Sequence, residues 1–140
     1  MKITFISNYL NHHQKKVCDA LWHETDMNFS FVETEHMREE RRLLGYGDDG
    51  NAPYALDYKD NPDVHEIKEI LINSDAIICG STNKKIRVLC GKLGKVLYRY
   101  SERPLKHGIQ PLKYLPRLIR WHRQNPASNP IYLLCASAYT

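Results

Sequence analysis

The stretch KITFISNYLNHHQ, residues 2–14, decides the fold class of this chain. Its first part, Lys2–Ser7, is apolar and contains β-branched residues, which is typical of a strand. Its second part begins a helical pattern that we expect to extend over Asn11–Glu24. The inner face of that helix is predicted to hold Val17, Ala20 and Leu21. A strand that passes directly into a helix is the first half of a βαβ unit.

The same alternation continues to the end of the chain. Further strands are predicted at Met27–Thr34, Pro53–Tyr58 (irregular or at an edge), Ala76–Cys79, Lys95–Tyr100 and Ile131–Cys135. Helices are predicted from Asn61, with Val64, Ile67 and Leu71 inward; at Lys84–Leu93; and at Tyr114–Gln124, with Leu115, Leu118, Ile119 and His122 inward. Such alternation implies a mainly parallel sheet with right-handed crossovers. The predicted fold is therefore α/β, a single Rossmann-like three-layer domain over residues 1–140.

Composition is that of one globular domain, but the charge is unevenly distributed. The chain has 140 residues, of which 42% are hydrophobic and 26% charged. Residues 1–83 hold 8 basic and 15 acidic side chains, a balance of −7, whereas residues 84–140 hold 12 basic and one acidic, a balance of +11. The basic half favours an anionic partner. The alternative is that the two halves neutralise one another in the fold.

The cysteines and the apolar runs bear on compartment and cofactors. Cys18, Cys79, Cys90 and Cys135 form no CxxC pair and are not followed by histidines at zinc-finger spacing. The longest apolar run, Ile131–Ala136, is too short to span a membrane. We therefore expect a protein of the cytoplasm that has no metal site and no cofactor.

Polar residues follow the first predicted strand, where parallel sheets bind their ligands. Asn8, Asn11, His12 and His13 lie in this connection. Two imidazoles there are suited to binding a polar ligand or to removing a hydroxyl proton. The alternative is structural: Asn11 caps the helix and His13 packs on its inner side.

Three further candidates follow other predicted strands. Glu33 lies near the end of the predicted strand Met27–Thr34 and is placed to accept ligand hydroxyls, although the charged run after it is typical of a solvated helix face. Ser81 and Thr82 stand between a buried strand and a helix, where small residues let a ligand approach the backbone. The alternative for Ser81 and Thr82 is a simple capping turn.

The loop after the Lys95–Tyr100 strand contains Glu102 and Arg103. A single carboxylate among cations is suited to accepting a proton from a hydroxyl or to orienting an arginine. The alternative is a structural ion pair of Glu102 with Arg103 or Arg99. A literal G-x-G-x-x-G at residues 45–50 is not flanked by a strand and a helix, so it does not indicate a dinucleotide site.

Residues 113–123 form a basic amphipathic pattern that contains Trp121. Such a helix is suited to an anionic membrane surface, which would place the protein peripherally at the inner face of the membrane. A solvated helix face is the more common case. No RNP, KH or helix-turn-helix signature is present, so no nucleic acid partner is expected.

Four stretches together resemble the N-terminal domain of bacterial GT-B-fold glycosyltransferases: ITFISNYLNHHQ (3–14), FVETEHMREERRLLGY (31–46), YRYSERPL (98–105) and LCASAYT (134–140). The resemblance is to enzymes that share the retaining, nucleotide-sugar-dependent plan. It implies a domain that receives a saccharide or lipid-linked acceptor. The nucleotide-sugar and the Glu-x7-Glu donor motif would belong to a second domain that this chain lacks, so the chain alone is expected to be inactive.

The resemblance also implies roles for the candidates named above. Asn8, His12 and His13 would line the cleft after the first strand, and Glu102 and Arg103 would line it nearer the end of the domain. Together with the positions of the other candidates, this predicts His12, His13 and Glu102 as the catalytic groups. The predicted acceptor contacts are Asn8, Asn11, Glu33, Ser81, Thr82 and Arg103. It implies no metal, because GT-B folds generally hold the donor diphosphate without one. The competing interpretation is a non-catalytic module, either flavodoxin-like or binding an anionic surface. A flavin site is disfavoured because residues 8–13 lack a run of Gly, Ser or Thr for the phosphate.

Overall fold

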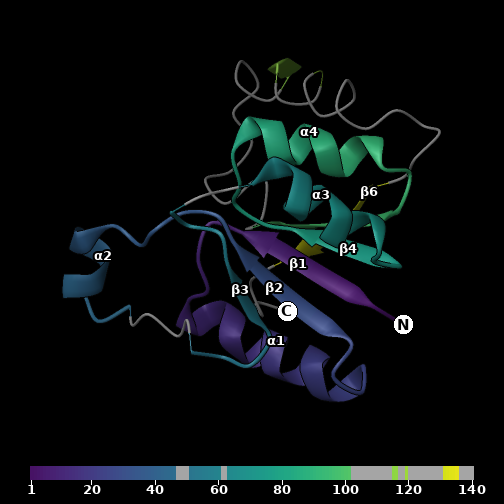
Figure 1. Ribbon diagram of the computed structural model, residues 1–140. Coiled ribbons are helices and arrows are strands. Elements are labelled where there is room, and N and C mark those ends of the chain that lie inside the picture. Colours follow the sequence, from purple (N-terminus) through teal and green to yellow (C-terminus); the bar gives the residue numbers. More distant parts are fainter. Residues whose placement is uncertain (47–50, 61–62, 102–114, 117–118, 120–130, 136–140) are drawn as a thin grey trace.

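The computed structural model describes residues 1–46, 51–60, 63–101, 115–116, 119 and 131–135 (Figure 1). In chain order its elements are β1 (Ile3–Ser7), α1 (His12–Glu24), β2 (Phe29–Glu33), α2 (Glu39–Leu43), β3 (Ala55–Asp57), α3 (Val64–Ile72), β4 (Ala76–Cys79), α4 (Lys84–Lys92), β5 (Val96–Ser101) and β6 (Ile131–Cys135). Within these residues all strand pairs are parallel, and the sheet order is β3-β2-β1-β4-β5-β6. The prediction of an α/β fold is confirmed. A mainly parallel sheet was predicted, and every pair of described strands is parallel.

The strand order reverses direction at β1. From β1 the chain builds outward through β2 to β3, and then it returns to place β4 on the other side of β1. The ends of the neighbouring strands are level, because Ser7 pairs with Glu33 and Ile6 pairs with Cys79. The connections that leave β1 and β4 therefore begin at the same edge of the sheet, on either side of the switch point.

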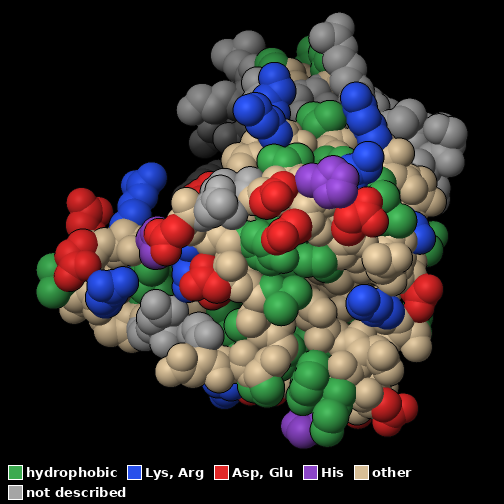
Figure 2. All heavy atoms as spheres, in the orientation of Figure 1, with side chains coloured by type: hydrophobic (Ala, Val, Ile, Leu, Met, Phe, Trp, Pro, Cys, Tyr) green, Lys and Arg blue, Asp and Glu red, His purple; other side chains and the backbone are tan. Residues whose placement is uncertain are grey.

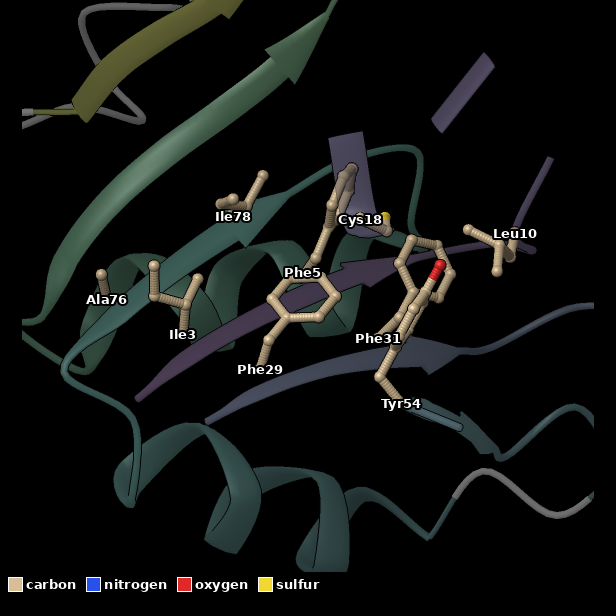
Figure 3. Close-up of a cluster of buried hydrophobic side chains, with 9 residues drawn as sticks. All are labelled: Ile3, Phe5, Leu10, Cys18, Phe29, Phe31, Tyr54, Ala76 and Ile78. Carbon is tan, nitrogen blue, oxygen red and sulfur yellow. The ribbon is translucent and has the colours of Figure 1, made fainter. Parts of the chain in front are cut away.

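Each face of the sheet packs its own hydrophobic core. On the α1 side, a cluster of aromatic and aliphatic side chains includes Phe5, Phe29, Phe31 and Cys18 (Figure 3). On the opposite face, Ile6, Val32 and Ile77 pack against side chains of α3 and α4. Alternation of side chains along a strand explains how β1 contributes Phe5 to one core and Ile6 to the other. The helices lie on both sides of the sheet, as the three-layer prediction requires (Figure 1).

The first helix is rotated relative to the prediction. Gln14 and Cys18 are its buried residues, whereas Val17 is 37% exposed and Ala20 is also exposed. Leu21 is only partly buried. The aromatic rings of the sheet occupy most of the space beneath α1, so the small Cys18 faces them and the branched Val17 turns to solvent. The assignment of Val17 and Ala20 to the inner face was wrong.

The beginning of α3 also differs from the prediction. Its N-cap is Asp63, whose carboxylate accepts hydrogen bonds from the backbone N–H groups of His65 and Glu66. Asn61 was expected in that role, and it lies outside the described residues. Val64, which was expected to face inward, is 48% exposed, whereas Ile67 and Leu71 are buried as predicted.

The Tyr114–Gln124 pattern falls mostly outside the described residues. Leu115 and Ile119 are described, and both are exposed, so the prediction that they face inward was wrong. The side chains of Leu118, His122 and Trp121 are not described. Among the described helices, none has both the length and the apolar character needed to cross a membrane.

The α2 helix projects from the body of the molecule (Figure 2). It carries Glu39 and Glu40 in its first turn and Arg41 and Arg42 in its last, an order that suits the helix dipole. The guanidinium of Arg42 lies 3.4 Å from the carboxylate of Glu39. The charged run after β2 is thus a solvated helix face, which was the structural alternative for that run.

Candidate functional site

The connections that leave β1 and β4 form the candidate site, which we call the switch-point edge and define as Ser7–His13 and Gly80–Asn83. In open parallel sheets, ligands bind where the strand order reverses, beyond the carboxyl ends of the strands. The two connections touch here: the hydroxyl oxygen of Ser7 lies 3.5 Å from the carbonyl oxygen of Ser81, and the N–H of Gly80 donates to the carbonyl oxygen of Ile6 over 2.9 Å.

Asn8 shapes the first of these connections. Its side-chain oxygen accepts hydrogen bonds from the N–H of Tyr9 at 2.9 Å and from the hydroxyl of Ser7 at 3.2 Å. Its backbone oxygen accepts from the N–H groups of Thr34 and Glu35, each at 2.8 Å. Asn8 therefore lies at the predicted edge, but its side-chain oxygen already serves the turn.

The two histidines lie in the first turn of α1, and both are exposed. Their rings are 3.8 Å apart between centroids, and the ring of Tyr46 lies 5.1 Å from that of His12. The guanidinium of Arg41 stands 5.7 Å from the Tyr46 ring. The alternative that His13 packs on the inner side of the helix was wrong. Both imidazoles are accessible to a ligand at the switch-point edge.

Asn11 caps α1, as the structural alternative proposed. Its side-chain oxygen accepts from the N–H groups of His13 at 3.0 Å and Gln14 at 3.2 Å. No acidic residue lies in the first turn of the helix, so the positive end of the dipole is not neutralised there by the helix itself. The cap fixes the position at which His12 and His13 leave the backbone.

Glu33 lies at the same edge but is completely buried. One carboxylate oxygen accepts from the N–H of Leu10 at 2.7 Å, and the other lies 2.9 Å from the ammonium of Lys59. Burial lowers the pKa of Lys59, but hydrogen bonds from its ammonium to Glu33 and Asp57 outweigh burial and leave that pKa above its usual value. Both oxygens of Glu33 thus bind protein groups, which leaves Glu33 without the surface that a ligand contact needs.

Ser81 and Thr82 differ in their exposure. The side chain of Ser81 is exposed, whereas Thr82 is buried. The Thr82 hydroxyl donates to the carbonyl oxygen of Asn83 at 3.4 Å and lies 3.8 Å from the sulfur of Cys79. Arg87 donates to the carbonyl oxygen of Thr82 at 2.9 Å. Of these two residues, Ser81 is therefore the one whose side chain is accessible, and Thr82 stabilises the turn.

A buried cysteine pair lies beneath this turn. Cys79 accepts a hydrogen bond from Cys90, which lowers the pKa of Cys79 below its usual value although burial opposes the shift. The nearby Arg99 and Arg87 cations act in the same direction. The same hydrogen bond, together with burial, raises the pKa of Cys90.

The sequence prediction missed Gln14. This residue is 5% exposed, and its amide nitrogen donates to the hydroxyl of Ser7 at 3.5 Å. Its carbonyl oxygen Oε1 is buried without a hydrogen-bond partner. Buried polar atoms normally have partners, so this oxygen marks a point of unsatisfied hydrogen bonding next to the switch-point edge. The available signal was its helical spacing from Cys18 and Leu21.

Glu102 and Arg103 lie outside the described residues, as does most of the segment 113–123. In the part of the chain that is described, no group of three or more His, Cys, Asp or Glu side chains is arranged to hold a metal ion. Comparison with family models, curated proteins and solved structures found no match. The site brings together two accessible imidazoles, a serine hydroxyl and an unpaired amide oxygen near a strand-order reversal.

Proposed function

We propose that this chain is the acceptor-binding half of a GT-B-fold glycosyltransferase. The observation that carries the proposal is the pairing of a strand-order reversal with accessible His12 and His13 on the connection that leaves β1. This edge is where a Rossmann-like domain binds its ligand. The resemblance of residues 3–14 and 31–46 to such enzymes supports the same interpretation.

In this proposal the histidines meet the reacting hydroxyl of a saccharide or lipid-linked acceptor. An imidazole orients that hydroxyl or removes its proton as the new glycosidic bond forms. Ser81 supplies a further hydrogen-bonding group from the neighbouring connection. The nucleotide-sugar would be held by a second domain, and the protein would act by positioning and by electrostatic stabilisation of the departing diphosphate.

The first test is binding. The ¹⁵N-labelled chain is titrated with a panel of methyl glycosides and with a prenyl-phosphate-linked sugar, and amide shifts are followed by NMR. We expect one or more panel members to shift the amides of Asn8, His12, His13 and Ser81. His13→Ala should weaken that binding. His23→Ala removes an exposed imidazole near the other end of α1 and should leave it unchanged.

The second test is turnover in a two-domain enzyme that contains this chain. If His13→Ala folds normally and retains full turnover, His13 has no part in the mechanism. If no glycoside shifts the amides of the switch-point edge, while a flavin or a vesicle of anionic lipid does, the acceptor-binding proposal is wrong. In that case the non-catalytic module takes its place.

A further inference from the structure

The conformation of the connection between β1 and α1 depends on a residue far away in the sequence. Leu10, within this connection, donates its N–H to the buried carboxylate of Glu33 at 2.7 Å. That carboxylate is held from its other side by the ammonium of Lys59 at 2.9 Å. Lys59 itself follows β3, at the edge of the sheet. A chain of contacts thus runs from the sheet edge across β2 to the segment that carries the histidines.

These contacts are shielded from water. The side chain of Glu33 is 1% exposed and that of Lys59 is 10% exposed. Leu10 is also fully buried, in the core beneath α1. A hydrogen bond to a charged, desolvated acceptor is stronger than one between neutral groups. The bond from Leu10 therefore holds the backbone immediately before the Asn11 cap more firmly than an ordinary turn would.

We propose that Lys59 and Glu33 are positioning residues for the switch-point edge. Their ion pair holds the backbone of Leu10, and this fixes the position and direction of the first turn of α1, which carries His12 and His13. The backbone consequence concerns the free protein and is independent of any ligand. The consequence for affinity rests on the proposed function. Neither residue touches the acceptor in this scheme.

The physical reason is the cost of an unpaired buried charge. Without Lys59, the Glu33 carboxylate would be desolvated and uncompensated, which a protein interior does not tolerate. It would turn toward water or take up a proton. In either case the Leu10 N–H loses its charged acceptor, and the 8–11 segment opens more often.

Native-state amide hydrogen exchange of the full chain tests this. In Lys59→Met the amide of Leu10 should exchange about tenfold faster or more than in the parent, because its acceptor is lost. Lys59→Arg keeps the cation and should restore slow exchange. Asp57→Asn removes the other carboxylate near Lys59, at 3.2 Å, but that side chain is 60% exposed and the variant should behave like the parent. The amides of Ile67 and Leu71 in α3 should not change.

Two results would overturn the proposal. One is Leu10 exchange in Lys59→Met at the parent rate. The other is an equal acceleration of every amide, which indicates global destabilisation. If Lys59→Met does not fold, the double variant Glu33→Gln with Lys59→Met replaces it and is judged by the same two results. The neutral amide at position 33 can still accept from the N–H of Leu10, but no ammonium group holds that amide in place. Glycoside titration of the same variants is scored separately, so absence of binding in the parent affects only the proposed function.

Discussion

A Cβ atom at Gly80 would lie 2.7 Å from the hydroxyl oxygen of Ser7, so the turn after β4 passes directly over the end of β1. The same Cβ would stand 3.1 Å from the Cβ of Ser7 and 3.1 Å from the Phe5 ring. Contact this close leaves no room for a side chain at position 80 unless Ser7 and the Phe5 ring move. It brings the two connections of the switch-point edge together.

Gly80→Ala should therefore destabilise the fold. Relief of the contacts requires movement of Ser7 and the Phe5 ring, and overpacking of this kind costs about 1–3 kcal/mol. Chemical denaturation measures the loss. Gly91→Ala is the matched control, because a Cβ there meets nothing within 4 Å and α4 gains a better helix former. Equal effects of the two substitutions would contradict the close approach at Gly80.

Gln14→Leu should not destabilise the protein, although Gln14 contacts Ser7 of the candidate site. The substitution eliminates a buried carbonyl oxygen that has no partner, at the loss of one long hydrogen bond to Ser7. We expect the free energy of unfolding to change by less than about 1 kcal/mol. Gln14→Glu places a carboxylate in the same buried position and should cost about 1–3 kcal/mol at neutral pH. A large loss in Gln14→Leu would mean that the oxygen has a partner.

Tyr54→Phe should raise the pKa of Asp19. The hydroxyl of Tyr54 donates to the Asp19 carboxylate at 2.7 Å and is the largest cause of the lowered pKa of Asp19, with Lys15 adding to it. A lowered folded-state pKa stabilises the protein above the unfolded pKa, and that contribution is lost as pH falls through the folded value. In Tyr54→Phe this part of the acid sensitivity should shrink. NMR titration of Asp19 gives the pKa, and an unchanged value would show that the hydroxyl is unimportant.

Cys90→Ala should raise the pKa of Cys79 by removing the hydrogen bond that favours its thiolate. The pH dependence of the Cys79 ¹³Cβ shift reports this directly. Cys18→Ala serves as the control, because Cys18 lies in the core on the other face of the sheet. Burial raises the pKa of Cys18 to about 12, so it stays protonated through the titration. A shift of the Cys79 midpoint in the control but not in Cys90→Ala would refute the pairing.

Most of the architecture could be read from the sequence because it depends on local patterns. The strand at Ile3–Ser7, the strand at Ala76–Cys79 and the cap at Asn11 each follow from residue types within a few positions. Parallel pairing followed from the regular alternation of strands and helices. The rotation of α1 did not, since it depends on the volume of the Phe5 and Phe31 rings beneath it.

The candidate site likewise combines features that local sequence patterns predict with features that depend on tertiary packing. The sequence by itself predicted that Asn8, His12, His13 and Ser81 follow strands of a parallel sheet, at the edge where ligands bind. The tertiary structure showed that these strands, β1 and β4, are neighbours. Only the tertiary structure decided which of the predicted side chains are exposed and which are buried. The carboxylate of Glu33 binds Lys59 and the N–H of Leu10, which approach it from elsewhere in the chain. Gln14 faces the core because of the way α1 packs on the sheet. Burial and long-range partners are properties of the assembled sheet, so no local pattern could reveal them.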